Sequence, residues 1–274
     1  MGLVVGPKRI ICLTEEPTEM LYLLGEENRI IGISVYTERP SIAKQEKTKV
    51  SAFISGNLKK IESLNPDLII GFSDIQGQLA KDLIERGFNV LIFNQRSIRE
   101  ILDNMYTLGS IVGQSERANS LISGWQRQME AWKIEASLSS HKPRVFFQEW
   151  DEPIITGIQW VSEAIEIAGG YDIFNDLKEK KMAKERITTA EDVAKRNPEV
   201  IVGSWCGKAM DWDWVRKKPE WQSTLAIQKD LIFEMDPSII LQPGPALFLE
   251  GIPKLKEIFR TVTTDLYESE KKSL

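Results

Sequence analysis

The sequence contains very little histidine, which removes several classes of catalytic and metal site. Its 274 residues include one histidine, His141, which lies in a polar segment just before Pro143. Ser-His-Asp and Cys-His catalysis need an imidazole held by a partner group, and zinc sites usually draw on several His or Cys ligands. We therefore expect His141 to be a solvated surface residue, and we expect neither a hydrolase triad nor a metal site.

Cysteine is almost as scarce, with only two in the chain. Cys12 lies inside an apolar run, where a thiol behaves as a small buried hydrophobe. Cys206 follows another apolar run, and the two cysteines are not in metal or redox spacing. We therefore expect no disulfide.

Long apolar runs and an excess of positive charge are also lacking. No apolar stretch approaches the ~18 residues of a membrane span, so we expect none. The 35 Lys and Arg residues against 40 Asp and Glu give a net charge of −5, which argues against nucleic-acid binding. The first residues lack the basic and cleavage regions of a secretory signal. These features predict a cytoplasmic protein as the chain stands, or an extracytoplasmic, periplasmic one if a signal has been removed.

An internal repeat divides the chain. Residues 57–71 and 189–203 share Asn-Pro, an acidic residue, three aliphatic residues and Gly, and an offset of 132 residues separates Pro66 from Pro198. In each copy Asn-Pro should end a short helix, because the residue before proline disfavours the α region. The aliphatic run that follows is typical of a strand buried on both faces of a parallel sheet. An offset of nearly half the chain indicates two similar lobes.

Strands alternate with helices in both halves, which predicts an α/β fold of two similar βα sandwich lobes. We expect an N-terminal lobe at 1–112, an interlobe helix at 113–140 and a C-terminal lobe at 141–274. Leu121, Ile122, Trp125, Met129, Trp132 and Leu138 recur near the helical period, which predicts one long helix between the lobes. The expected strands are Arg9–Leu13, Arg29–Ile33, Leu68–Ile70, Asn89–Phe93 and Arg144–Phe147, and the expected helices are Thr18–Gly25, Gln78–Arg86 and Val161–Gly170.

Several short segments, in the right order over nearly the whole chain, resemble one family. The segments are Pro17-Thr18-Glu19, Ile31-Gly32-Ile33-Ser34, Gly56-Asn57-Leu58, Asn65-Pro66-Asp67, Ala168-Gly169-Gly170, Asn197-Pro198-Glu199 and Gln242-Pro243-Gly244-Pro245. They are similar to the helical-backbone, or class III, substrate-binding proteins of ABC importers, particularly the vitamin B12 and ferric-siderophore binders. The resemblance implies a ligand cleft between the lobes and a non-catalytic binding protein.

Five aromatic residues stand where B12 binders of this family contact their ligand or beside strand ends. They are Tyr36, Phe53, Phe72, Trp150 and Trp205. In open α/β sheets ligands gather beyond the carboxyl ends of strands, and aromatic rings supply rigid apolar walls. A glycine before an aromatic residue would let the backbone approach a ligand. The alternative is that these rings only cap the sheet cores. Trp212 and Trp214 alternate, so one can line a pocket while the other packs, and we expect Trp221 to pack against Leu225.

The charged and metal-binding side chains available near the predicted loops narrow the class of ligand. Metal-ion binders of this architecture use histidines and carboxylates, which one linker histidine does not supply. Anionic siderophores and haem usually call for clustered arginines or tyrosines, and the only arginines near the predicted loops are Arg39 and Arg96. A large, weakly charged corrinoid such as cobalamin fits better, with a ferric siderophore or haem as the alternative. No resident cofactor is required.

The resemblance also implies docking residues for an ABC-type permease. B12 importers use one glutamate per lobe, and Glu191 keeps this residue whereas Lys59 reverses its charge. Like charges at an interface are costly, so the alternative role is a stand-alone cytoplasmic sensor or scaffold on the same fold. We expect a monomer. An enzyme using the carboxylates of Asp74, Glu149, Asp151 and Glu152 is a third hypothesis, but no positioned partner for them is visible in the sequence.

Overall fold

A computed structural model describes residues 6–272. The chain divides into two compact units. The first comprises residues up to Gln95, Arg99–Trp125 and Gln242–Pro245. The second comprises Arg96–Ile98, Gln126–Leu241 and the residues from Ala246 onward. The units are therefore not two uninterrupted stretches, because two short segments of the chain belong to the unit built mainly from the other half.

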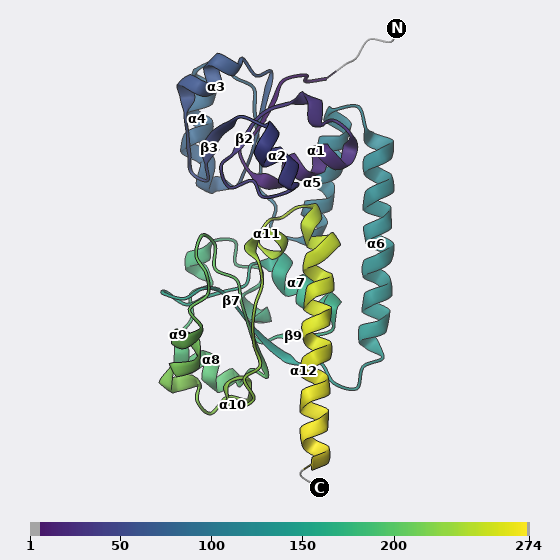
Figure 1. The fold of residues 1–274 in the computed structure, drawn as a ribbon, viewed down its shortest axis with the longest axis vertical. Coiled ribbons are helices and arrows are strands. Elements are labelled where there is room, and N and C mark those ends of the chain that lie inside the picture. The colour runs from purple at the N-terminus through teal and green to yellow at the C-terminus, as the bar shows by residue number, and fades with distance from the viewer. Residues whose placement is uncertain (1–5, 273–274) are drawn as a thin grey trace. The chain divides into compact units, whose positions relative to one another are not determined.

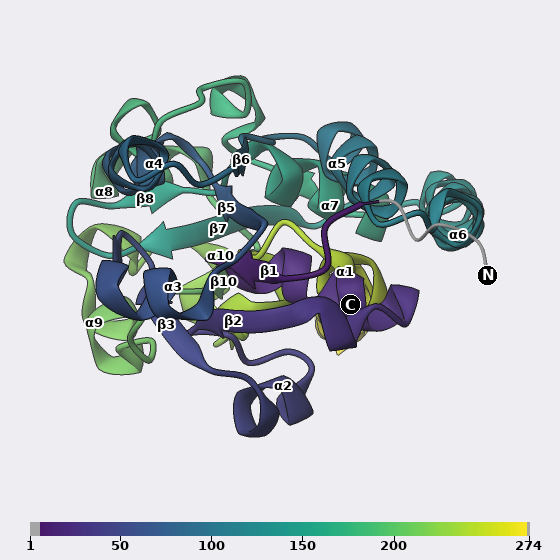
Figure 2. The ribbon, with the colours of Figure 1, turned by 90° about the horizontal axis from the view of Figure 1, so that it is seen from above.

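The first unit contains a six-stranded sheet in the order β4-β3-β2-β1-β5-β6, parallel except for β4. Helices α3 and α4 cover the face that carries Ile11 and Ile69, while α1 and α5 lie on the other side (Figure 2). The elements are β1 Ile10–Cys12, α1 Glu15–Leu24, β2 Ile30–Ser34, α2 Ser41–Glu46, β3 Lys49–Ala52, β4 Ser55–Gly56, α3 Leu58–Leu64, β5 Leu68–Phe72, α4 Gly77–Glu85, β6 Val90–Phe93 and α5 Ile98–Ile111.

The second unit contains a smaller sheet in the order β11-β10-β7-β8, with β9 paired to β7 and β8 antiparallel. One apolar cluster of this unit joins Phe146 and Ile201 of the sheet to Val193, Val215 and Trp221. The elements are β7 Arg144–Trp150, β8 Ile155–Thr156, α7 Gln159–Ala168, β9 Tyr171–Asp172, α8 Ala190–Arg196, β10 Val200–Gly203, α9 Trp212–Lys217, α10 Leu225–Gln228, β11 Ile232–Glu234, α11 Pro237–Ile240 and α12 Ile252–Lys272.

The two copies of the sequence repeat have the same backbone conformation and the same arginine contact at their Asn-Pro turns. Asn65 and Asn197 both end their helices in the left-handed region, with φ of 47° and 46°. The Arg9 Nε donates to the carbonyl of Asn65 at 3.0 Å, and the Arg144 Nε donates to the carbonyl of Asn197 at 2.9 Å. Each arginine starts or precedes the strand that neighbours its turn. The shared Asn-Pro pattern therefore encodes one turn and one strand junction, used twice.

The long helix is α6, Ser115–Ser137, and it contributes residues to both units. Its end near Ser137 leaves Leu138 outside the helix and 82% exposed, so the prediction that Leu138 continues the apolar stripe is wrong. The C-terminal part of α6 lies beside α12 (Figure 1), where Lys256 pairs with Glu135. Helix α12 also packs on α7.

Two sequence-based expectations about single side chains have different outcomes. Cys12 is buried and both cysteines are free, as expected. His141 is not simply solvated, because its Nε2 lies 3.2 Å from the carboxylate of Glu199. Glu199 accepts a hydrogen bond from the backbone N–H of Arg144 at 2.7 Å, which places its carboxylate beside the segment that leads into β7.

Candidate functional site

The predicted aromatic residues of the first unit do follow strand ends. Tyr36 comes two residues after β2 and is 58% exposed. Phe53 comes directly after β3 and is partly buried. Phe72 is the last residue of β5 and is only 8% exposed. Of these three rings, those of Tyr36 and Phe53 therefore offer more accessible surface than that of Phe72.

A glutamine that the sequence analysis missed connects two of these positions. The Gln76 side chain is fully buried; its Nε2 donates to the carbonyl of Phe53 at 2.6 Å, and its Oε1 accepts from the N–H of Phe72 at 2.9 Å. The two bonds hold the loop after β3 against the end of β5. No local pattern marks Gln76, because both partner groups belong to the backbone and one of them, the carbonyl of Phe53, is 23 residues away.

The glycines before the aromatic residues serve packing within each unit. A Cβ at Gly71 would lie 2.3 Å from the Gln76 Oε1, and one at Gly203 would lie 2.5 Å from the Met210 sulfur. Packing inside each unit thus accounts for both glycines, and the approach of a ligand to the backbone at these positions stays a prediction. Each makes room for a side chain that follows the strand and folds back onto its end.

Acidic residues that the sequence analysis did not single out gather at the carboxyl end of β1. Glu15, Glu16 and Glu19 begin α1, and all three are buried. Burial raises the pKa of Glu15 to about 8 and that of Glu16 to about 7. Arg39 pairs with Glu19 at 3.0 Å, and its backbone N–H donates to Glu15. The sequence does contain a signal for this cluster, since three acidic residues fall within five positions shortly after a predicted buried strand.

In the second unit, Trp150 and Trp205 lie at the ends of adjacent strands. Trp150 is the last residue of β7 and is partly buried. Trp205 lies two residues after β10, is 1% exposed and meets Trp214 edge to face at 6.1 Å between ring centroids. Its burial favours the core-packing alternative, although Trp205 also lines a depression of about 520 Å³ with Lys208, Glu234 and Pro237.

The three remaining tryptophans of this region pack together. Trp214 lies edge to face against Trp221 at 5.6 Å, and Trp212 packs on the same cluster. Trp221 is fully buried and donates from its Nε1 to the carbonyl of Ala190 at 3.0 Å. Packing of Trp221 was expected, but Leu225 is not on its helix, since Trp221 ends one turn of 3-10 helix and α10 begins at Leu225.

Buried polar atoms without hydrogen-bond partners in the described chain gather near the carboxyl ends of β7 and β10. Gln148 pairs with Gly203 and Thr156 across the sheet, and Ser204 donates its N–H to the carbonyl of Gln148 at 3.0 Å. Buried polar groups normally have partners, so unpaired ones indicate water or ligand. The unpaired atoms are both side-chain polar atoms of Gln148, the hydroxyls of Thr156 and Ser204, the Nε of Arg186 and the Nε1 of Trp205.

The carboxylates of the enzyme hypothesis are engaged with neighbouring groups. Glu149 forms a two-pronged ion pair with the buried Arg186, at 2.7 and 3.1 Å. Asp151 pairs with Lys208 at 2.7 Å, and Glu152 lies 3.9 Å from Lys218. Asp74 accepts a hydrogen bond from the hydroxyl of Ser73 at 2.9 Å. None of these contacts sets two carboxylates against each other in the manner of an acid-base pair.

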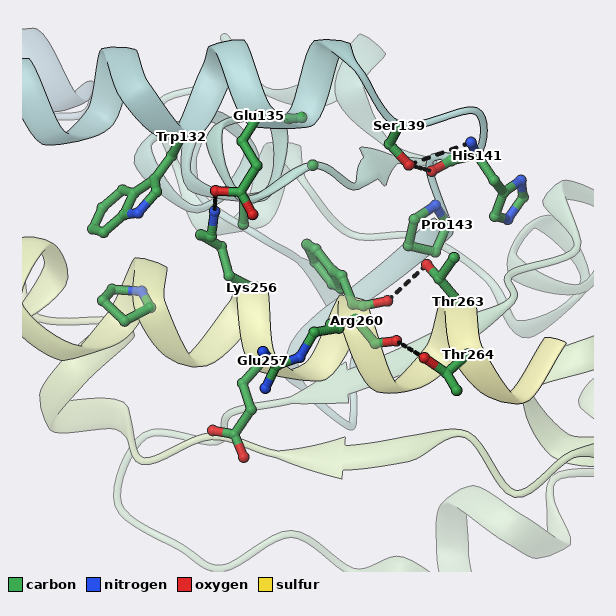
Figure 3. A pocket seen from close by; sticks show the side chains of 15 residues that line it. Trp132, Glu135, Ser139, His141, Pro143, Lys256, Glu257, Arg260, Thr263 and Thr264 are labelled. Carbon is green, nitrogen blue, oxygen red and sulfur yellow. Dashed lines mark hydrogen bonds and ion pairs between the residues drawn. The ribbon is translucent and has the colours of Figure 1, made fainter. Parts of the chain in front are cut away.

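A second cavity, of about 440 Å³, lies between α6 and α12 (Figure 3). Trp132, His141, Lys256 and Arg260 are among its lining residues. Pro143, which also lines it, immediately precedes β7, so this cavity is at the amino end of that strand. Because ligands of open α/β sheets gather at carboxyl ends, the cavity is a less suitable ligand site than the strand ends.

The expected docking residues occupy matching positions. Lys59 lies in the first turn of α3 and Glu191 in the first turn of α8, and both are exposed. The helices are capped by Asn57 and Thr189, whose side chains accept from the N–H groups of Lys60 and Asp192. Within residues 6–272 no cluster of candidate metal ligands occurs. Over the same range, no helix is both long and apolar enough to span a membrane.

Comparisons with known proteins agree with this architecture. The vitamin B12-binding protein of Vibrio cholerae is 28% identical over 244 residues, covering 87% of this chain and 84% of the relative. An uncharacterised ABC transporter substrate-binding lipoprotein, YvrC of Bacillus subtilis, is 25% identical over 263 residues, covering 92% and 79%. The periplasmic haem-binding protein RhuT of Roseiflexus has the same fold, with a TM-score of 0.80, 20% identity and coverage of 94% and 99%. The family model described as periplasmic binding protein matches residues 10–239, and this two-unit α/β chain belongs to that family.

Proposed function

We propose that this protein binds a large, flat and weakly charged ring compound, a corrinoid such as cobalamin, and delivers it to an ABC-type permease. The observation that carries the proposal is the set of aromatic side chains at the carboxyl ends of strands in both units. Tyr36 and Phe53 supply partly exposed rings in the first unit, and Trp150 supplies one in the second. Rigid rings at such edges suit stacking on a flat ligand.

The arginines support a ligand of low net charge. Burying an anion requires countercharges, and Arg39 and Arg96 were the two candidates near the strand-end loops. Arg39 is paired with Glu19 at 3.0 Å. Arg96 is 8% exposed, and its Nε donates to the carbonyl of Lys181 at 3.1 Å. Both guanidinium groups are thus engaged within their own units.

The unpaired polar atoms of the second unit suit the periphery of a corrinoid. Corrinoids carry amide side chains around the ring, which both accept and donate hydrogen bonds. Gln148 offers an unpaired acceptor and an unpaired donor, and Ser204 offers a hydroxyl. Ring stacking combined with a few placed polar groups is the usual composition of a small-molecule site.

Titration of the purified protein with cyanocobalamin tests the proposal. Binding should quench tryptophan emission saturably, because the ligand absorbs in the near ultraviolet. Phe53→Ala should weaken binding about thirtyfold, since removing one aromatic wall costs ~2 kcal/mol at a binding hot spot. It should leave the melting temperature nearly unchanged, because Phe53 is only partly buried.

Tyr106→Ala is the matched control, because Tyr106 is 47% exposed but lies on α5, away from the strand ends. It should not alter the titration. If neither cobalamin nor cobinamide quenches the wild-type protein at tens of micromolar, the corrinoid assignment fails. If Phe53→Ala lowers the free energy of unfolding by several kcal/mol, Phe53 is a core residue.

Haem is the second candidate, and the exposed phenol of Tyr36 is the observation that favours it. A tyrosine oxygen is one of the axial ligands that proteins give to haem iron. Addition of hemin should then produce a Soret spectrum that Tyr36→Phe changes. We expect no such spectrum, because Arg39 and Arg96 contact groups of their own units and Arg186 is paired with Glu149.

The relatives also support an extracytoplasmic site of action, since their names place them in the periplasm or describe a lipoprotein. Delivery to an importer would take place on the outer side of the cytoplasmic membrane. Fractionation of cells that express the native gene, followed by immunoblotting, tests this location. Recovery in the cytoplasmic fraction would instead support the sensor alternative.

A further inference from the structure

Lys208 lies over two of the aromatic rings that end the strands of the second unit. Its Nζ is 4.4 Å from the ring centroid of Trp150 and 4.9 Å from that of Trp205. The same ammonium contacts both carboxylate oxygens of Asp151 at 2.7 Å. Two aromatic faces and a carboxylate together form a site for a cation, and a side chain of the chain itself fills it.

The contact with Lys208 is one reason why the Trp205 side chain is only 1% exposed. Trp214 meets the Trp205 ring edge to face, and Lys208 lies over it. Both Trp205 and Lys208 line the depression described above. Lys208 therefore covers part of the Trp205 ring at the edge of that depression, with a side chain that is itself 42% exposed.

We propose that Lys208 is a displaceable cover over Trp150 and Trp205, which a flat ligand must move aside before it can stack on these rings. This inference rests on the proposed function, and it makes Lys208 a residue that sets the affinity of the ligand site. An ammonium and a flat ring system cannot occupy the same indole face. The contacts of Lys208 are therefore lost in part whenever a ligand stacks there.

The surroundings of Lys208 allow such a movement. Its side chain is 42% exposed, and residues 206–209 form an exposed segment outside regular helices and strands. Gly207, next to it, has a φ of +86°, a backbone conformation that favours glycine. Asp151 follows Trp150 directly, so the ammonium can leave the rings while keeping its ion pair with this carboxylate.

A flat ligand can stack only while the cover is open. The apparent affinity is therefore the affinity of the open state multiplied by the fraction of time that the cover is open. A cation-aromatic contact at an exposed site corresponds to a factor of about two to five, and two rings are involved. Lys208→Ala should therefore bind cyanocobalamin about five- to tenfold more tightly than the wild-type protein. Lys217→Ala is the matched control, because Lys217 pairs with Asp213 on exposed α9 and should leave the affinity unchanged.

A second arm measures the cover without any ligand. Acrylamide, a neutral quencher, should reach more of the tryptophan emission in Lys208→Ala than in the wild-type protein or in Lys217→Ala. Nuclear magnetic resonance of reductively methylated lysines should show upfield-shifted signals for the lysines that lie over indole rings, which include Lys218 over Trp214 at 4.1 Å as well as Lys208. The signal of Lys208 is the one that disappears in Lys208→Ala, and it should return toward the position of an exposed lysine in Trp150→Ala, whereas the signal of Lys218 should stay in both variants.

The possible outcomes distinguish a failure of the Lys208 proposal from a failure of the corrinoid assignment. If acrylamide quenching is unchanged and Lys208→Ala removes no upfield-shifted lysine signal, Lys208 does not cover the rings and the proposal is overturned. If Lys208→Ala binds cyanocobalamin as well as or more weakly than the wild-type protein, displacement is overturned as well. If the cover is observed but cyanocobalamin binds to no variant, the corrinoid assignment fails, and stacking of hemin then decides between displacement and a fixed cover by the same affinity ratio.

Discussion

At the scale of single residues, each unit places unusual side chains at the carboxyl ends of its strands. The first unit has three buried glutamates in the first turns of α1, and the Glu15 Oε1 and Glu16 Oε2 have no hydrogen-bond partner in the described chain. Burial penalises the charged form of a carboxyl group, which is why the pKa values of Glu15 and Glu16 are raised. Such groups couple protonation to stability, and they lie where the fold places ligands.

Stability should therefore depend on pH through Glu15. Its pKa is raised from 4.5 to about 8, so the folded chain holds more protons than the unfolded chain between these values. The contribution is fully present below about pH 4.5 and is lost as pH rises through 8. Glu15→Gln should flatten the fall in the free energy of unfolding between pH 5 and 8.5 by on the order of 1–2 kcal/mol, as measured by urea denaturation.

Glutamine keeps the acceptor that the N–H groups of Glu38 and Arg39 use, so the variant should fold. Glu85→Gln, an exposed position on α4, serves as the control and should follow the wild-type curve. A Glu15→Gln curve that parallels the wild type would show that Glu15 is charged in the folded chain at neutral pH.

At the scale of elements, α6 is the segment whose residues belong to both units. The helix contains one glycine, Gly124, which lies next to the residue where the division falls. An added Cβ at Gly124 would meet nothing within 4 Å. Glycine in a helix interior costs roughly 0.5–1 kcal/mol relative to alanine, and no packing in the structure requires it here.

Gly124→Ala should therefore stabilise the protein by about 0.5–1 kcal/mol, measured by thermal or urea denaturation. Gly109→Ala on α5 is the opposite case, because its Cβ would lie 2.4 Å from that of Ala118, and it should destabilise the protein by about 1–3 kcal/mol. Destabilisation by Gly124→Ala would reveal a required backbone distortion at that position.

At the scale of the whole molecule, the repeat places equivalent surfaces on both units. Lys59 and Glu191 occupy the same place in the repeat, in the first turns of α3 and α8, yet they carry opposite charge. The proposed importer would meet an acidic residue on one unit and a basic residue on the other. The permease surface for the first unit would then need to differ from that for the second.

Transport by cells that carry the cognate permease tests this docking. Glu191→Lys should reduce uptake strongly, because like charges at an interface cost several kcal/mol, whereas Lys59→Glu should be neutral or improve uptake. Lys195→Glu, at the other end of α8, is the control and should have little effect. Equal losses from the first two variants would indicate an acidic permease partner for Lys59.

The sequence by itself determined the local pattern of this protein. Aliphatic runs such as 68–70 and the Asn-Pro turns at 65–66 and 197–198 specify buried parallel strands and helix ends, because these preferences act between near neighbours. The repeat predicted two α/β units, and short motifs spread along the chain indicated the family. The strand-end positions of Tyr36 and Trp150 followed from the predicted strands before them, whereas Phe53 was singled out through the family resemblance, since no strand was predicted before it.

Only the tertiary structure decided what those positions contact. Gln76 reaches Phe53 from 23 residues away, and Lys208 reaches Trp150 and Asp151 from more than 50 residues away. Glycines at 71 and 203 make room for side chains that the sequence does not place. Such contacts depend on which strands become neighbours and how each side chain packs. They are long-range, so neither periodicity nor spacing encodes them in a readable form.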